Sequence, residues 1–246
     1  METKNQNQKL EERLIVFTLL LLCLTLSSIF VMATPTGPSS INITANETGT
    51  TTAAEMVNIS GGYISTINIT ASTQNPHWKA FVGWIDGKFT LDDSSGSTIY
   101  DWTLSTVSGE VYATRESTAV EWTTVNCANE THITTEDTAL EHTGEDDINA
   151  TFSGNNSNTF VVAGTTIAAQ NCSAINTYVD NESQTSTFEE AILYDSTGSD
   201  LIFATILEED EDGFDENDYD FQMIVPENGN ETFAGATAYY LYVELS

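Results

Sequence analysis

The sequence predicts an all-β protein: a β-sandwich or jelly-roll-like fold of about ten strands after an N-terminal hydrophobic signal or anchor helix. Three observations support this fold class. Short segments alternate apolar with polar residues, as half-buried strands do. Gly, Asn and Asp separate these segments, as in tight turns. Hydrophobic residues make up 40% of the chain and aromatic residues 10%, which is too many for a disordered acidic chain.

The predicted strands fall into two groups, and a more helical stretch separates them. In the first group, the Asp-Gly pair at 86–87 predicts a two-residue hairpin turn. In the second, residues 201–207 are apolar on both faces, which is typical of a central, covered strand. Two short helices are predicted within 117–129 and 135–142, the latter with Thr135 as N-cap. The strands are expected at 57–59, 65–71, 78–85, 88–91, 98–104, 110–114, 160–169, 186–194, 200–207, 219–225 and 235–245.

Residues 1–33 are predicted to be a signal peptide or a membrane anchor. Arg13 precedes Leu14–Met32, a run of 19 residues without charge that is long enough to span a bilayer. The small residues at its end fit cleavage after Ala33. Both alternatives stay open, and both place the rest of the chain outside the cytoplasm. A membrane is expected to be contacted only through residues 14–32, and only if the run is not cleaved.

The remainder is expected to comprise a Thr/Ser-rich tether, 34–55, and a single acidic β-sandwich domain, 56–246. The whole chain has 37 Asp and Glu against 6 Lys and Arg, a formal net charge of −31. Nucleic-acid binders need clustered cations to displace the counterions of phosphate, so this class of protein is excluded. The expected location is extracellular or at the cell surface.

Cysteines and sequons agree with this location. Cys127 and Cys172 are an even pair in an exported chain, which predicts one disulfide. Ten Asn-x-Ser/Thr sequons predict a glycosylated surface. At 41–44 and 67–70, Ile residues share one strand face while Asn and Thr share the other, so a glycan would project to solvent. The sequon asparagines are Asn42, Asn46, Asn58, Asn68, Asn129, Asn149, Asn155, Asn171, Asn181 and Asn230.

The acidic run 208–220 is a candidate calcium site. Its first acids alternate at positions 1, 3 and 5 of a calcium loop, and Gly213 at position 6 permits the sharp turn. Tyr219 stands at position 12 in place of the bidentate Glu, so other acids would complete a different geometry. The alternative is a solvated acidic hairpin. The candidate ligands are Glu208, Asp210, Asp212, Asp215, Asp218 and Asp220.

Two further groups of residues carry weaker signals. Histidines and acids mix between 132 and 147 without the spacing of a zinc site, and this stretch is interpreted as a polar solvated loop. An exposed row among Trp78, Trp84, Trp102 and Trp122 would make a sugar-stacking platform, although packing is the commoner role of tryptophan. No Gly-x-Ser-x-Gly or His-Glu-x-x-His element is present, so the chain is not predicted to be an enzyme.

The stretches Gly61-Gly62, Trp78–Phe81, Asp92–Trp102 and Gly109–Thr114 resemble uncharacterised secreted or surface β-rich proteins of archaea. The resemblance covers about a quarter of the chain and implies a compartment, because no catalytic motif comes with it.

The predicted function is structural or adhesive: a subunit of a coat or filament, or an anchored ectodomain. Its expected partners are other copies of itself or other surface proteins, and segment 34–55 is either a tether or a strand donated to a neighbour's sheet edge. The alternatives are a carbohydrate-binding module, whose partners would be glycans, and a secreted hydrolase with two close carboxylates in a cleft.

Overall fold

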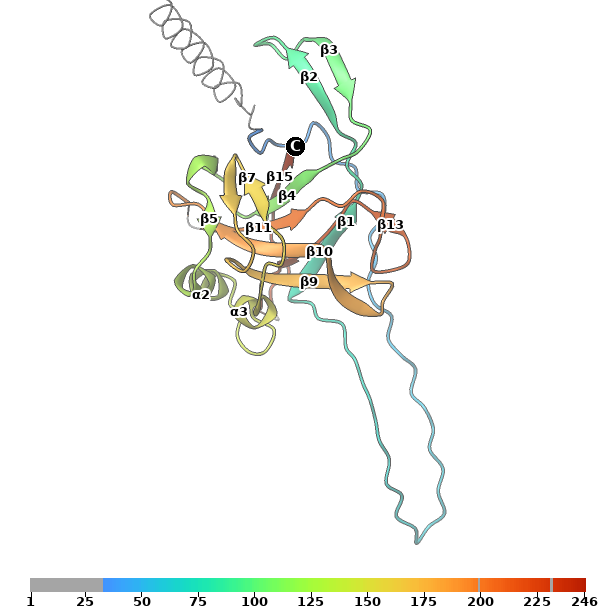
Figure 1. The fold of residues 1–246 in the computed structure, drawn as a ribbon. Helices are drawn as coiled ribbons and strands as arrows, with labels where there is room; N and C mark the ends of the chain where they lie inside the picture. The colour runs from blue at the N-terminus through green and yellow to red at the C-terminus, as the bar shows by residue number, and fades with distance from the viewer. Residues whose placement is uncertain (1–32, 199, 231) are drawn as a thin grey trace, which may run out of the picture. The chain divides into compact units, whose positions relative to one another are not determined.

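A computed structural model describes residues 33–198, 200–230 and 232–246, of which 33–246 form one unit (Figure 1). The expected signal or anchor helix lies outside the described residues. Within the described part of the chain, no helix has the length and apolar character needed to cross a bilayer.

The centre of the fold is a seven-stranded antiparallel sheet. Its strands follow the order β15-β4-β11-β10-β9-β6, and β5 also pairs with β10. β11 lies in the middle and is buried on both faces from Leu201 to Thr205, as its apolar sequence predicts. The strands are β4 (Gly109–Thr114), β5 (Asn126–Cys127), β6 (Gly154–Asn155), β9 (Ser173–Val179), β10 (Ser183–Tyr194), β11 (Leu201–Ile206) and β15 (Tyr240–Leu245).

One face of this sheet is covered by a β-ribbon and two helices. The ribbon pairs β1 (Trp78–Gly83) with β14 (Phe221–Pro226), and the helices are α2 (Glu130–Ala139) and α3 (Ile148–Thr151). Phe203 of the sheet shares one core with Met223 of the ribbon and residues of both helices. Arg115 also binds the buried carboxylate of Glu136 through two hydrogen bonds of 2.7 and 2.9 Å, which fixes α2 to the sheet.

The opposite face is covered by a small hairpin and a 3-10 turn. The hairpin pairs β7 (Phe160–Val162) with β8 (Thr165–Ile167), and the turn is η1 (Trp122–Thr124). Tyr112 and Ile202 of the sheet pack here against Val162 and Trp122. The all-β prediction is therefore confirmed, with one large sheet between two smaller, mixed layers.

Two further short β-ribbons lie outside the central sheet. One pairs β2 (Lys88–Asp92) with β3 (Thr98–Thr103), and the other pairs β12 (Glu211–Asp212) with β13 (Asp218–Tyr219). The hairpin predicted at 86–87 is wrong, because β1 pairs with β14 and β2 pairs with β3. The amide of Ile85 instead donates to the buried carboxylate of Asp220 at 2.6 Å, which holds the chain away from a return along β1.

The helical predictions between the two groups of strands are wrong in detail. Segment 117–129 contains only the turn η1 and the strand β5. The helix expected from Thr135 begins earlier, because the side chain of Asn129 accepts the amide of His132 and caps α2. Thr135 instead bonds the carbonyl of Thr131 from inside the helix.

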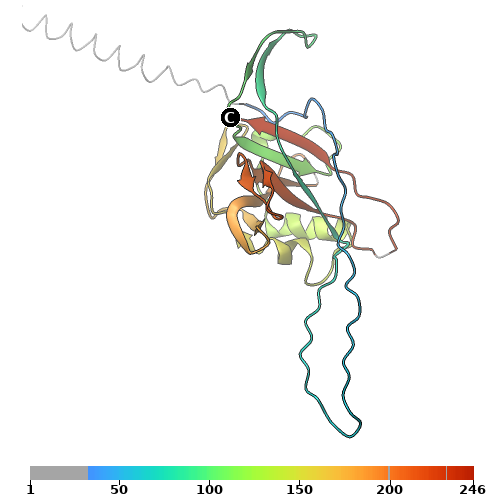
Figure 2. The same ribbon diagram turned by 90° about the vertical axis from the view of Figure 1, so that its right-hand side faces the viewer.

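Residues 37–77 contain no strand, although strands were predicted at 57–59 and 65–71. The chain leaves the sheet just after Thr36, which forms a bridge with Val243 at the outer edge of β15. The extended segment therefore continues past the predicted tether boundary at residue 55. Figures 1 and 2 show it projecting from the rest of residues 33–246.

The predicted disulfide is present. Cys127 and Cys172 are bonded across 45 residues with their Cα atoms 4.9 Å apart. β5 and β9 pair with the same edge of β10, so the bond joins two neighbouring segments of that edge.

Replacing both cysteines, Cys127→Ser with Cys172→Ser, should lower the free energy of unfolding by roughly 3–4 kcal/mol, because the bond restricts the unfolded chain. Urea unfolding of the purified protein, followed by tryptophan fluorescence, measures this change. The matched control is Cys23→Ser, which should leave the free energy of unfolding unchanged. A double variant as stable as the control would contradict the prediction.

Candidate functional site

The hairpin β2–β3 carries an uncovered apolar face. Phe89 lies opposite Trp102, and Leu91 lies opposite Tyr100, so these four side chains share one side of the hairpin. The exposed fraction is 45% for Phe89, 49% for Trp102, 55% for Leu91 and 59% for Tyr100. The rings of Tyr100 and Trp102 meet edge to face at 4.9 Å. We call Phe89, Leu91, Tyr100 and Trp102 the aromatic face.

The other side of the same hairpin is mostly polar, apart from Ile99, which is 80% exposed. Lys88 forms an ion pair with Asp101 at 2.8 Å, and Thr90 donates to Asp92 at 2.7 Å. Both sides are open, because every residue of β2 and β3 is exposed. An isolated two-stranded hairpin is marginally stable in water. The hairpin is thus amphipathic, and nothing in the described chain covers its apolar side.

A second uncovered element is the extended segment, which we call the arm (residues 39–76). Every residue of the arm is exposed, including Ile64, which is 100% exposed, and Ile69, which is 75% exposed. Among its described backbone groups, a single mutual hydrogen bond forms, from Tyr63 to Ser60. The alternation at 65–71 is that of a strand, but no backbone ladder forms along it in the described structure.

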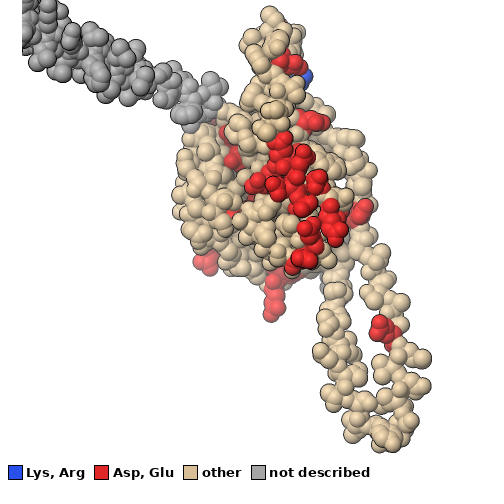
Figure 3. All heavy atoms as spheres, turned by 45° about the vertical axis from the view of Figure 1, so that its right-hand side comes forward, with Lys and Arg blue, Asp and Glu red and all other residues tan. Residues whose placement is uncertain are grey.

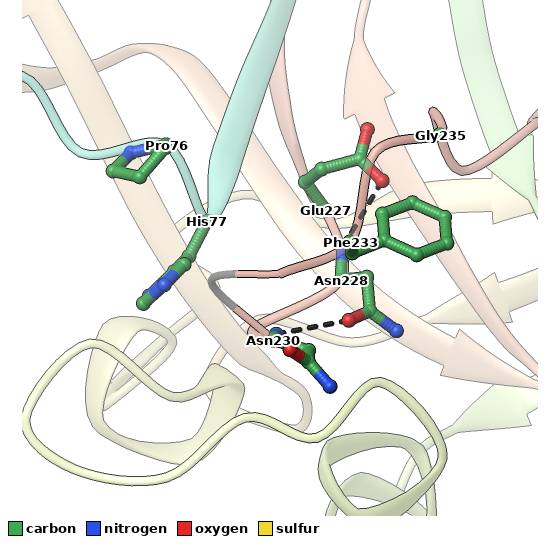
Figure 4. Close-up of a pocket in the computed structure, with 7 residues that line it drawn as sticks. All are labelled: Pro76, His77, Glu227, Asn228, Asn230, Phe233 and Gly235. Atoms are coloured by element: carbon green, nitrogen blue, oxygen red, sulfur yellow. Dashed lines mark hydrogen bonds between the residues drawn. The ribbon is translucent and has the colours of Figure 1, made fainter.

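The cavity in Figure 4 lies where β1 begins and β14 ends. Its volume is about 400 Å³. Figure 4 shows His77 across from the ring of Phe233, with two asparagine amides between them. The lining residues are Pro76, His77, Glu227, Asn228, Asn230, Phe233 and Gly235.

Charged groups fix two residues of this cavity. Nδ1 of His77 lies 2.9 Å from a carboxylate oxygen of Asp146, and this hydrogen bond lowers the pKa of Asp146. Burial opposes ionisation of Glu227, but hydrogen bonds led by the one from Lys79 at 2.8 Å outweigh it and lower the pKa of Glu227 to about 2. The ring of His142 bonds the carbonyl of Glu227 at 2.6 Å.

No sequence motif marks this cavity, because His77 and Glu227 are far apart along the chain. A carboxylate that holds an imidazole in one orientation is an element of hydrolytic sites. The described lining residues include no Ser, Thr or Cys that could act as a nucleophile. The amides, the imidazole and the phenyl ring of the lining are groups that a small polar ligand could contact.

The stretch 132–147, interpreted as a solvated loop, is one only in part: residues 132–139 belong to α2, and three of its eight His, Asp and Glu side chains are buried. Glu136, Asp137 and His142 are 2%, 8% and 6% exposed, respectively. The ring of the buried His142 bonds the carbonyl of Glu227 through Nε2, and in the described chain its Nδ1 has no hydrogen-bond partner. Helix α2 brings these residues against the sheet, where Arg115 compensates the charge of Glu136.

The acidic run 208–220 folds as the ribbon β12–β13 and its turn. Asp220 is buried and accepts the amides of Ile85 and Asp210. Asp215 accepts the hydroxyl of Tyr219 at 3.2 Å. Across the described residues, no group of three or more His, Cys, Asp or Glu side chains is arranged to hold a metal ion. Calcium binding by the six candidate ligands stays a prediction.

The asparagines of the ten sequons differ little in accessibility. All are exposed except Asn230, which is half-buried in the cavity lining and donates to Glu141 at 3.0 Å. Asn42, Asn46, Asn58 and Asn68 lie on the arm. A transferase could reach the exposed ones in the folded chain.

Two carboxylates are buried beneath the β7–β8 hairpin. Glu110 and Glu244 lie opposite each other on β4 and β15 and are 6% and 4% exposed. Glu244 accepts the amide of Ala163 at 2.9 Å and the hydroxyl of Tyr112 at 3.0 Å, whereas Glu110 accepts the amide of Val161 at 3.3 Å. Burial raises the pKa of Glu110 to about 8, and the charge of Glu244 adds to the rise.

This pair has the raised pKa values that a hydrolase would use, but the hairpin covers it. Burial also raises the pKa of Glu244. A substrate would have to displace β7 and β8 to reach either carboxyl group. The pair is therefore suited to hold two layers of the fold together.

The raised pKa of Glu110 predicts a loss of stability with rising pH. Its pKa is about 8 in the folded chain and 4.5 unfolded, so the stabilisation is complete below pH 4.5 and is lost as the pH rises through 8. Glu110→Gln keeps the acceptor for Val161 and should remove a dependence of about 1.4 kcal/mol per pH unit in that range. Urea unfolding at several pH values measures it.

The matched control is Glu55→Gln, which removes one carboxylate from the exposed arm. It should keep the pH dependence of the parent chain. If the Glu110→Gln variant and this control show the same slope of unfolding free energy against pH, Glu110 is not the protonated group.

Comparison with known proteins assigns this chain to no family. No protein-family model, curated protein or solved structure matches it. Its function must therefore be argued from its own surfaces, of which the aromatic face, the arm and the cavity of His77 stand out.

Proposed function

We propose that this protein is an exported, glycosylated structural or adhesive subunit of the cell surface that associates with copies of itself. The observation that carries the proposal is the aromatic face. Four large side chains exposed together on one side of a hairpin form an apolar patch of the kind that marks protein interaction sites. The arm adds a second apolar surface of the same kind.

Three further features support export and assembly at a surface. The disulfide is of the kind that persists in oxidising compartments. Nine exposed sequons offer attachment sites for glycans. All three Lys and Arg residues of 34–246 are held in ion pairs within the chain, so most of the acidic surface in Figure 3 has no basic group beside it. Such a surface is soluble in saline surroundings, where salt screens the repulsion between copies.

Association should depend on the aromatic face. The variant Phe89→Ser, Leu91→Ser, Tyr100→Ser, Trp102→Ser removes most of the apolar area of the hairpin and should weaken self-association at least roughly tenfold. Sedimentation velocity of the purified full chain, at about 0.1 M and about 1 M salt, measures the association constant.

The matched control changes the polar side of the same hairpin, with Thr90→Ser and Thr103→Ser. It should associate like the parent chain. A parent chain that stays monomeric at both salt concentrations and up to high protein concentration would overturn the proposed function.

A second candidate function is carbohydrate binding. The specific observation in its favour is that Phe89, Tyr100 and Trp102 expose aromatic rings on one side of a hairpin, since sugar rings stack on such rings. The amides of the His77 cavity are a second place for a sugar.

Binding of the purified protein to an array of immobilised glycans tests this candidate. Trp102→Ala should reduce the signal roughly tenfold if the aromatic face holds the sugar, because one stacked ring contributes about 1–2 kcal/mol. The control is Trp122→Phe, a substitution in the core. An array without signal for the parent chain would contradict carbohydrate binding and leave self-association unaffected.

A further inference from the structure

We propose that residues 65–71 of one copy add as a third strand to the edge of β3 in a second copy, with Ile67 and Ile69 packed on the aromatic face. The inference rests on the self-association proposed above and names the two segments that meet.

The arm has every feature of a strand except a partner. Its Ile67 and Ile69 fall on one side, with Thr66 and Asn68 on the other. Ile67 is 56% exposed and Ile69 is 75% exposed. In the described structure no ladder forms along this stretch, so its amides and carbonyls are free to pair with a sheet edge.

The β2–β3 hairpin lacks a third strand. β2 and β3 pair only with each other, so each presents one open edge. A third strand gives the minimum sheet that is stable in water, and its apolar residues would cover the aromatic face. The lengths agree, because residues 65–71 span about 23 Å when extended and β3 spans about 20 Å.

The absence of charge on both elements is compatible with their contact. Among residues 37–75 the only charged side chains are Glu47 and Glu55, and both lie outside 65–71. The aromatic face contains no charged residue. Much of the rest of the chain is acidic, whereas contact between these two elements brings no carboxylates of 65–71 or of the aromatic face together.

A second copy, rather than the same chain, is the partner that the placement favours. The arm and the β2–β3 hairpin project from opposite ends of the described unit in both Figure 1 and Figure 2. The arm is also anchored at both ends, by the Thr36–Val243 bridge and by the pairing of Trp78 with Pro226. Asn68 would point away from the aromatic face, so a glycan there is compatible with pairing.

Trapping by disulfides between copies tests the inference in a Cys23→Ser background. One preparation carries Ile67→Cys and the other Tyr100→Cys, and the two are mixed in mild oxidant. Covalent dimers of unlike copies should form roughly tenfold faster than with Thr66→Cys in place of Ile67→Cys, because only position 67 can bring its Cβ within the 3.5–4.5 Å that a disulfide needs. Both positions of the arm are exposed, so neither substitution disturbs the core.

Equal rates for positions 66 and 67, in a protein that still associates in sedimentation, would overturn the inference and leave the proposed function standing. A chain with both Ile67→Cys and Tyr100→Cys that closes a bond only within itself would also overturn it. A protein that does not associate at all would overturn both proposals.

Discussion

The central sheet has to be covered on both faces, and the rest of the fold follows from this constraint. β11 is apolar on both sides, so one face needs the β1–β14 ribbon with its helices and the other needs the β7–β8 hairpin. Carboxylates make polar contacts between the layers. Glu110 and Glu244 hold amides of the hairpin, while Glu190 accepts the amide of Ile224 in β14 at 2.8 Å. Burial raises the pKa of all three.

Elements with a local sequence pattern could be predicted, whereas elements whose structure depends on a partner far along the chain could not. The apolar run at 200–207 and the cysteine pair could be predicted, since a mostly apolar run and a pair of cysteines after residue 33 are visible in the sequence itself. The hairpin at 86–87 could not be excluded, because the competing partner of β1 is β14, far along the chain. The burial of Glu136 depends on Arg115, and the His77 cavity on Glu227; neither pairing leaves a sequence signal.

The strand predicted at 65–71 is absent from the structure for a different reason. Its alternating pattern is correct for a strand, but in the described structure no ladder pairs it with another segment. The exposed β2–β3 hairpin has an edge without a third strand. The two uncovered elements are complementary in length, pattern and charge, which is why their incompleteness argues for association rather than for disorder.

The two anchors of the arm have a mechanical consequence. One end continues into a single bridge at Val243, while the other continues into the six-residue register of β1 with β14. If a neighbouring copy pulled on the arm, the two anchors would resist the force to different extents. The bridge has two hydrogen bonds, of 3.0 and 2.9 Å, and would open first. The released residues would lengthen the arm while the ribbon resists in shear, so the subunit would stretch before its core is loaded.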